Sequence, residues 1–461
     1  MNNDTICALA TANGVGALGI IRVSGNESLP IVQRSFPAKN LGKQKSHTIH
    51  YGYFMDGDEA VDEVMVSIFL APKSFTTENS VEIAFHGSPH IGKRILETLI
   101  KNGARMAKAG EFTLRAFING RIDLSQAEAI ADVIASENEA SRKVAISQLK
   151  GGITNEISVL RTDLLNFVSL IELELDFAEE DVEFADRSAL TLLLNKIESK
   201  LDSLIESFQY GNAIKNGTAV AIIGKPNAGK STLLNALLKE ERAIVSNIAG
   251  TTRDTIEEVL HIKGHAFRLI DTAGLRETVD EIEAIGVKKA KEKVENAQIL
   301  VYLADAATAD FTEDIEMIRS LVRDDLKLIV CATKIDEVSP PQYEKVEQIF
   351  RNTLSHEFDF ITISAVENQN IQDLKNELSS YVEQLKASEN NVVITNQRHF
   401  EALRKSLDAI HRVNEAITFR ISTELLAFEL RNALEYLGEI SGEVTNDEVL
   451  GNIFSKFCIG K

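Results

Sequence analysis

The chain has 461 residues, of which 26% are charged and 44% hydrophobic, and a formal net charge of −20. This length provides for two to four domains with sizeable cores, and no apolar run approaches the roughly 20 residues that span a bilayer. The negative charge repels nucleic acid from most of the surface, so any contact with RNA must be local.

Cysteine usage and the first residues indicate the compartment. Cys7, Cys331 and Cys458 are too few and too scattered for a disulfide framework or a zinc site. The segment from Met1 to Asp4 lacks the basic region of a secretory signal. We therefore expect a cytoplasmic protein in a reducing environment, without contact to a membrane.

Residues 1–120 mix short β-rich runs, such as Gly19 to Val23 and Val81 to His86, with a helical stretch near Pro89 to Asn102. This mixture predicts an α+β domain. The run from Gly14 to Gly19 matches the dinucleotide fingerprint G-x-G-x-x-G, but it precedes a strand instead of following one and opening a helix. A tight loop beside a ligand pocket or at a strand end is therefore the better interpretation.

Residues 121–215 change to a helical pattern. Their apolar residues repeat at intervals of three and four, as on the buried face of long packed helices: Ile153, Ile157, Leu160, Leu164, Val168, Ile171 and Leu175. Helical periodicity returns over residues 386–461. We expect these two segments to form one helical domain with residues 216–385 inserted in its middle, because the ends of a compact domain often lie close together.

The inserted segment contains a complete G-x-x-x-x-G-K-[ST] phosphate-binding loop, from Gly224 to Ser231. A strand-like apolar run precedes it and a helical run follows it, which is the context that the loop requires. Glycines let successive N–H groups converge on the β- and γ-phosphates, Lys230 supplies positive charge, and Ser231 offers its hydroxyl to Mg²⁺. A nucleoside triphosphate site is predicted.

Two switch-like motifs follow the phosphate loop. The segment Gly250 to Asp254 offers a threonine that can close over Mg²⁺ when the γ-phosphate is present, and we favour Thr252. The segment Asp271 to Gly274 ends an apolar run, so that Asp271 can reach the Mg²⁺ shell and the Gly274 N–H the γ-phosphate.

Two later motifs predict the base. In the segment Thr333 to Asp336, the carboxylate of Asp336 can accept from both the ring N–H and the exocyclic amine of guanine, a pairing that adenine cannot make. Ser364 and Ala365 end the next strand with small residues that let a loop backbone touch the base edge. The predicted nucleotide is therefore GTP.

The chain departs from most such GTPases at two positions. Thr333 stands where asparagine is usual, and its hydroxyl has fewer hydrogen-bonding groups, so we expect a less firmly held loop but unchanged guanine selectivity. Leu275 stands where Ras-like proteins carry the glutamine that orients water. Spacing cannot choose a replacement among the following charged residues: Arg276, Glu277, Asp280, Glu281 and Glu283.

Continuous apolar runs such as Ile299 to Leu303 and Leu328 to Ala332 alternate with helical segments, as in a parallel sheet covered on both faces. The predicted fold class is multidomain α/β. An N-terminal α+β domain (1–120) precedes a helical domain (121–215 and 386–461), and a P-loop, Ras-like GTPase domain with a mainly parallel sheet (216–385) is inserted into the helical domain.

From end to end the chain resembles the MnmE (TrmE) family of tRNA modification GTPases. The resemblance rests on Gly16 to Arg22, Gly110 to Phe117, the inserted domain with Gly250 to Asp254 and Asp271 to Glu277, and the terminal tetrapeptide Cys458 to Lys461. The GTPase motifs fit many relatives. The terminal tetrapeptide joined to this domain order is far more specific.

The resemblance implies a homodimer, formed through an N-terminal domain that binds 5-formyl- or methylene-tetrahydrofolate. Arg22, Glu82, Arg121 and Lys461 fall on the folate-binding positions. With a flavin-dependent partner, MnmG (GidA), in a heterotetramer or larger complex, the family adds an aminomethyl-type or carboxymethylaminomethyl group to carbon 5 of the wobble uridine of certain tRNAs. Cys458 is implicated in that chemistry.

The resemblance also implies that two nucleotide domains meet for GTP hydrolysis and that K⁺ takes the place of an arginine finger. Asn227, Ser246, Ile248 and Thr251 would bind K⁺, and Ser231 and Thr252 would bind Mg²⁺. The implied catalytic residues are Glu283, which orients water, Lys230 and Cys458. The full expected GTP-binding set is Asn227, Ala228, Gly229, Lys230, Ser231, Thr232, Ser246, Ile248, Thr251, Thr252, Asp271, Thr272, Ala273, Gly274, Thr333, Lys334, Asp336, Ser364 and Ala365.

Two alternatives use the same nucleotide domain without substrate chemistry: a GTP-dependent ribosome-assembly factor and a plain regulatory switch. Assembly factors usually append a basic RNA-binding domain, and none is visible in this acidic sequence. The sequence leaves open which tRNAs are modified, whether the partner makes most of the RNA contact, the nitrogen donor and the role of Cys458. Binding of folate would distinguish a tRNA-modifying enzyme from these two alternatives.

Overall fold

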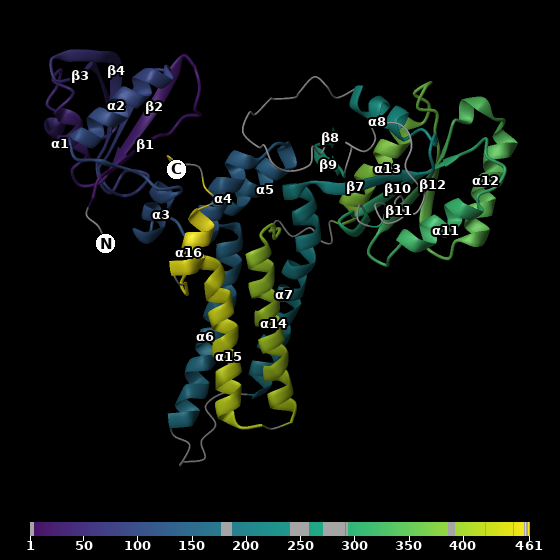
Figure 1. The fold of residues 1–461 in the computed structure, drawn as a ribbon. Coiled ribbons are helices and arrows are strands. Elements are labelled where there is room, and N and C mark those ends of the chain that lie inside the picture. The colour runs from purple at the N-terminus through teal and green to yellow at the C-terminus, as the bar shows by residue number, and fades with distance from the viewer. Residues whose placement is uncertain are drawn as a thin grey trace. The chain divides into compact units, whose positions relative to one another are not determined.

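A computed structural model describes residues 4–176, 187–239, 258–270, 291, 294–385, 392–419, 421–445, 447–455, 457 and 460 (Figure 1). The chain divides into two compact units. The first comprises residues 1–135, 146–193 and 408–461, and the second comprises 136–145 and 194–407. Across these described ranges, every helix is too short or too polar to span a bilayer.

The first unit opens with a six-stranded sheet in the order β3-β4-β5-β2-β1-β6. Its strands are β1 (Ile6–Leu9), β2 (Leu18–Ser24), β3 (Thr48–Asp56), β4 (Glu59–Phe69), β5 (Ser80–His86) and β6 (Arg105–Met106). Neighbours are antiparallel except for the parallel pair β1–β6. Because β2 begins at Leu18, the glycine pattern leads into a strand, as the sequence predicted.

Strand alternation gives this sheet one apolar face. On β5, Val81, Ile83 and Phe85 are buried, whereas Glu82 and His86 point to the opposite face. Helices α1 (Ser28–Gln33) and α2 (Pro89–Lys101) pack on the apolar side and complete one hydrophobic core with β2, β4 and β5.

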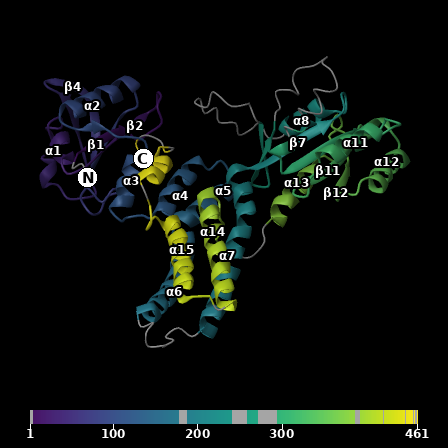
Figure 2. The ribbon, with the colours of Figure 1, turned by 60° about the horizontal axis from the view of Figure 1, so that its bottom comes forward.

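Helices from both ends of the chain pack together in the first unit. They include α3 (Glu111–Ile118), α4 (Leu124–Ala135), α6 (Gly152–Asp176), α15 (Thr423–Ser441) and α16 (Asp447–Phe454). Figures 1 and 2 show α15 alongside α6, where Arg161 of α6 donates to the carbonyl oxygen of Leu434 on α15. Three further helices contribute residues to both units: α5 (Glu139–Leu149), α7 (Arg187–Asn216) and α14 (Gln397–Thr418).

The second unit holds a six-stranded sheet in the order β12-β11-β10-β7-β9-β8. Its strands are β7 (Thr218–Gly224), β8 (Glu258–Ile262), β9 (His265–Leu269), β10 (Ile299–Asp305), β11 (Lys327–Thr333) and β12 (Phe358–Thr362). Every pair is parallel except the β8–β9 hairpin. The predicted mainly parallel sheet is therefore confirmed.

Both faces of this sheet are covered by helices. One core joins α8 (Lys230–Lys239) and α13 (Ile371–Gln384) to one face, and a second core joins α11 (Thr312–Leu321) and α12 (Pro340–Thr353) to the other. Leu303 belongs to the first core and Tyr302 to the second, as strand alternation requires. Burial on both faces explains why these strands are continuous apolar runs.

Candidate functional site

The phosphate-binding loop joins the carboxyl end of β7 to the start of α8. Gly224 lies so close to β10 that a Cβ there would be 2.5 Å from the carbonyl oxygen of Leu303. Asn227 and Gly229 have positive φ angles of 63° and 92°, which turn the backbone into the helix. The loop therefore requires glycine at position 224, where its backbone approaches β10, and residues that tolerate a positive φ at positions 227 and 229.

The loop ends in an anion-binding arrangement. Helix α8 begins at Lys230, so the N–H groups of its first turn and the helix dipole are directed at the loop. The Lys230 ammonium donates to the carbonyl oxygens of Gly224 at 2.6 Å and Lys225 at 2.7 Å, which holds its charge over the loop. Ser231 and Thr232 are exposed at the helix start, and Asn227 is exposed in the loop.

Thr333 connects the end of β11 to the phosphate loop. Its hydroxyl is buried and lies 3.0 Å from the carbonyl oxygen of Ala228 and 3.3 Å from that of Ala304. The sequence led us to expect a less firmly held loop with threonine at this position. A hydroxyl has a single donor hydrogen, and the nearer of its two acceptors is the carbonyl oxygen of Ala228 in the loop.

The predicted base-recognition residues follow directly after Thr333. Lys334 has a φ of 58°, and its ammonium lies 2.6 Å from the Asp305 carboxylate. This hydrogen bond raises the pKa of Lys334, so the side chain stays charged. Asp336 is exposed in the short 3-10 helix Ile335–Glu337.

The second predicted base-contacting segment follows β12. Ser364 is buried and exchanges backbone hydrogen bonds with Gln369, and its hydroxyl accepts from the Glu367 N–H at 3.2 Å. Because β7, β11 and β12 are parallel, their following loops lie at one edge of the sheet. The fold thus brings the phosphate loop, Thr333 to Asp336, and Ser364 with Ala365 to the same edge.

The predicted switch residues and most of the predicted cation ligands lie outside the described residues. They are Ser246, Ile248, Thr251, Thr252, Asp271, Thr272, Ala273, Gly274 and Glu283. Of the expected Mg²⁺ and K⁺ ligands, the structure therefore places Ser231 and Asn227.

Three predicted folate-binding residues gather in the N-terminal domain. Arg22 on β2 and Glu82 on β5 are cross-strand partners, and their side chains form an ion pair of 2.8 Å. The guanidinium of Arg121 lies 5.3 Å from the ring centroid of Phe75, and that of Arg22 lies 5.6 Å from the same centroid. Arg22 also lies 5.7 Å from the ring of Phe112. Lys461, the fourth residue, lies outside the described residues.

The carboxyl-terminal segment lies against the same domain. Phe457 is buried in a cluster with Phe454 and Leu124. Gly460 has a φ of 97°, and a Cβ there would be 2.2 Å from the carbonyl oxygen of Leu9 at the end of β1. Of the last residues, Phe457 and Gly460 therefore pack against other parts of the chain, whereas Cys458 falls outside the described residues.

Comparison with known proteins identifies this combination of domains. The family model for the GTP-binding protein TrmE N-terminus matches residues 5–121, and the model for the MnmE helical domain matches residues 124–458. The chain belongs to the MnmE family of tRNA modification GTPases. The expected resemblance and the predicted fold class are confirmed, whereas the domain limits stay predictions.

Relatives from the MnmE family match over the whole chain. Proteins named tRNA modification GTPase MnmE are 51% identical in Flavobacterium johnsoniae, 50% in Christiangramia forsetii and 49% in Bacteroides thetaiotaomicron. Each match covers 100% of this chain, and it covers 100%, 99% and 100% of the respective relative.

Sequence reasoning missed two aromatic residues beside the predicted folate-binding arginines. The Phe75 ring contacts the guanidinium groups of Arg22 and Arg121, and the Phe112 ring contacts that of Arg22. Phe112 belongs to the stretch from Gly110 to Phe117 that carried part of the resemblance, so a signal was present. Phe75 lies in a loop, where no pattern distinguished it from an ordinary partly buried aromatic residue.

An ionic network fastens α3 to the N-terminal sheet. Glu111 accepts from Arg105 at 2.5 Å and from Arg115 at 3.2 Å, and Arg115 also pairs with Asp4 at 2.9 Å and with Glu78 at 3.1 Å. Burial acts to raise the pKa of Glu111, but the hydrogen bonds from Arg105, the Lys108 N–H and Arg115 outweigh burial and lower it. The network therefore consists of charged groups.

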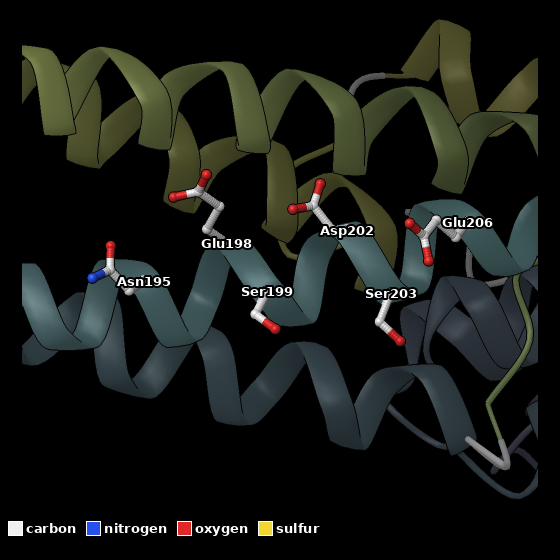
Figure 3. Close-up of a pocket in the computed structure, with 6 residues that line it drawn as sticks. All are labelled: Asn195, Glu198, Ser199, Asp202, Ser203 and Glu206. Carbon is white, nitrogen blue, oxygen red and sulfur yellow. The ribbon is translucent and has the colours of Figure 1, made fainter. Parts of the chain in front are cut away.

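A hollow of about 530 Å³ lies along α7. Its lining residues all come from α7 and are polar or acidic: Asn195, Glu198, Ser199, Asp202, Ser203 and Glu206 (Figure 3). No group of three or more metal-binding side chains occurs in the part of the chain that the structure describes. We assign no function to the hollow.

Proposed function

We propose that the protein hydrolyses GTP to GDP and uses this reaction in the modification of tRNA at carbon 5 of the wobble uridine. Membership of the MnmE family supports the overall activity. The observation that carries the GTPase assignment is the phosphate loop with Lys230 at its end, at the same sheet edge as Asp336. A carboxylate at that edge selects guanine.

Mg²⁺ fits the oxygen-bearing residues of this site. Ser231 follows Lys230 at the start of α8, and its hydroxyl is a ligand type that Mg²⁺ accepts beside nucleotide phosphates. Thr252 is the proposed second protein ligand. When bound, the ion neutralises charge on the phosphates. Lys230 and the first-turn N–H groups of α8 hold and orient those phosphates for attack by water.

K⁺ is the proposed second cation. The exposed position of Asn227 in the phosphate loop makes its side-chain oxygen available as a ligand, together with oxygens from Ser246, Ile248 and Thr251. Such an ion supplies positive charge where charge develops between the β- and γ-phosphates. Glu283 is the proposed residue that orients the attacking water, since Leu275 cannot.

The N-terminal domain is the proposed site of a reduced folate. Arginines bind carboxylates by charge-assisted hydrogen bonds, and Glu82 can accept from an amino-pyrimidine ring of the pterin type. Arg22, Glu82 and Arg121 already converge there, and Lys461 is the proposed fourth contact. The bound tetrahydrofolate derivative supplies a one-carbon unit, with Cys458 taking part in the reaction.

A homodimer is supported by an apolar surface on the open face of the N-terminal sheet. The exposed fraction is 58% for Leu18, 67% for Ile49, 64% for Tyr51, 54% for Tyr53 and 42% for Met65. Apolar patches of this kind are typical of protein interfaces. The proposed complex adds a flavin-dependent partner, MnmG, and tRNA, in the cytoplasm.

The decisive experiment is mass spectrometry of wobble nucleosides from cells that lack the protein and from cells that carry its Arg22→Ala variant. We expect the modified uridine to disappear in both, while purified Arg22→Ala still hydrolyses GTP. A thermal shift with tetrahydrofolate that Arg22→Ala abolishes would exclude both alternatives without substrate chemistry. Unchanged nucleosides in the deletion strain would reject the tRNA assignment.

A further inference from the structure

Lys225, the first residue after Gly224, extends its side chain away from the phosphate loop to α11. Its ammonium lies 2.9 Å from a carboxylate oxygen of Asp314 and 2.9 Å from one of Glu313. The two acidic partners differ in environment, since the Asp314 side chain is 4% exposed and that of Glu313 is 75% exposed. A screened surface pair contributes little, so Asp314 is the partner that matters.

Tyr302, on β10, is the third side chain that contacts Asp314. Its hydroxyl donates to Oδ1 of Asp314 at 2.9 Å, whereas Oδ2 of Asp314 faces Lys225. Burial, and then the nearby charge of Asp314, raises the pKa of Tyr302, which keeps its proton. Burial acts to lower the pKa of Lys225, but hydrogen bonds to Asp314 and Glu313 outweigh it and raise the pKa. The carboxylate thus has a partner for each oxygen.

This arrangement fixes one end of the loop whose other end is fixed by Thr333. Lys225 is held by Asp314, and the carbonyl oxygen of Ala228 accepts from Thr333. Between them lie only Pro226 and Asn227, both exposed. The carbonyl oxygen of Lys225 also accepts from the ammonium of Lys230. The position of Lys225 therefore bears directly on the lysine that holds the phosphates.

We propose that Asp314 is a positioning residue of the nucleotide site. It acts through Lys225 to hold the phosphate loop in the conformation that receives the β- and γ-phosphates, and Tyr302 keeps the carboxylate in place. This inference rests on the proposed GTPase function, and it adds α11 to the elements that determine the shape of the nucleotide site. Errors of about 1 Å in the placement of reacting groups can reduce rates about a hundredfold, so a side chain remote from the phosphates can matter.

The test is the full-length Asp314→Asn variant. Asparagine keeps the shape and the acceptor for Tyr302 but removes the charge that holds Lys225. We expect kcat/KM for GTP to fall about tenfold or more, with a weaker affinity for both GTP and GDP. Glu313→Gln is the matched control, because it removes the neighbouring exposed partner, and we expect parent-like kinetics.

If Asp314→Asn folds poorly, variants of Lys225 test the same interaction from its other side. The Lys225 side chain is 29% exposed and belongs to a loop, so Lys225→Met should still fold, with a lower melting temperature because the Asp314 carboxylate loses its partner. Kinetics measured below that temperature should reproduce the loss seen in Asp314→Asn. Lys225→Arg, which retains the charge, should restore most of the activity. The double variant Lys225→Met with Asp314→Asn should be no worse than either single variant, because both changes break one interaction.

Three outcomes would overturn the inference: parent-like kinetics in Lys225→Met, parent-like kinetics in a folded Asp314→Asn, or fully additive losses in the double variant. A merely structural role would lower the melting temperature without changing nucleotide affinity at temperatures where the variant is folded. Failure of the proposed function is a separate result, because the parent protein itself would then neither bind nor hydrolyse GTP.

Discussion

The hydroxyl of Thr333 lies 3.0 Å from the carbonyl oxygen of Ala228, which places a side chain from the end of β11 on the phosphate loop. The contact is buried, and the same hydroxyl is within 3.3 Å of the Ala304 carbonyl oxygen. A buried carbonyl that loses its donor destabilises a protein by about 1–3 kcal/mol. Thr333 therefore connects the phosphate loop energetically to the segment that we propose reads guanine.

We predict that Thr333→Val weakens the binding of GTP and GDP about tenfold, because the side chain keeps its shape but no longer donates to the loop. Titration calorimetry on nucleotide-free protein would measure this effect. Thr333→Ser keeps the hydroxyl and should bind nearly as the parent does. Preference for GTP over ATP should be unchanged in both variants, since it rests on Asp336. Equal affinities for Thr333→Val and the parent would contradict the role of the hydroxyl.

We predict that Asn227→Ala and Asn227→Gly both lose the stimulation of GTP hydrolysis by K⁺. The two variants separate the side chain from the backbone, because Asn227 has a φ of 63°, which alanine adopts only with strain and glycine adopts freely. Nucleotide affinity should thus be nearly intact in Asn227→Gly and somewhat lower in Asn227→Ala. Rates in KCl and NaCl would be compared, and a glycine variant that K⁺ still stimulates would discard the assignment.

Features that depend on residues close together in the chain could be predicted from the sequence. The phosphate loop, its flanking strand and helix, and the mainly parallel sheet could be predicted because each depends on local spacing and on continuous apolar runs. Asp314 and Glu313 look like ordinary acidic residues in the first turn of a helix, and only the packing of α11 beside β10 brings them to Lys225. The contact of Thr333 with Ala228 could not be predicted for the same reason, since its acceptor belongs to another loop, and the expected looser hold of threonine compared with asparagine stays a prediction.

We predict that the N-terminal domain loses stability in acid. A hydrogen bond from Arg105 lowers the pKa of Asp4, and the pKa of Glu111 is lowered as well. Carboxylates with depressed pKa values stabilise the fold above their unfolded values, near 4 for both, and this contribution is lost as the pH falls through the folded values. Urea unfolding between pH 3 and pH 7 would show a free energy of unfolding that decreases below about pH 4.5.

The matched variants for acid unfolding are Glu111→Gln and Glu139→Gln. Removal of the buried Glu111 charge should destabilise the protein by about 3 kcal/mol at pH 7 and flatten the dependence on pH. Glu139 pairs with Arg142 and Lys143 at exposed positions, so its variant should unfold nearly as the parent does. A Glu111→Gln profile as steep as that of the parent would show that other carboxylates determine the acid transition.

We predict that Phe75→Leu weakens the binding of tetrahydrofolate by roughly three- to thirtyfold. Its ring contacts the guanidinium groups of both Arg22 and Arg121, and each cation–π contact contributes about 0.5–1 kcal/mol. The measurement is the thermal shift with 5-formyltetrahydrofolate. Phe69→Leu changes an aromatic ring that contacts His47 instead, and it serves as the control. Equal shifts for both variants would remove Phe75 from the proposed site.

We predict that Gly460→Ala separates the two activities of the protein. At a φ of 97°, alanine is strained, and its Cβ would be 2.2 Å from the Leu9 carbonyl oxygen, so the terminal residues have to leave the end of β1. GTP hydrolysis depends on the inserted domain and should be unchanged. Wobble-uridine modification should fall at least tenfold, because Cys458 and Lys461 flank this glycine. Gly451→Ala is the control, since nothing lies within 4 Å of a Cβ at that position. Full modification by Gly460→Ala would mean that docking of the terminus is not required for the reaction.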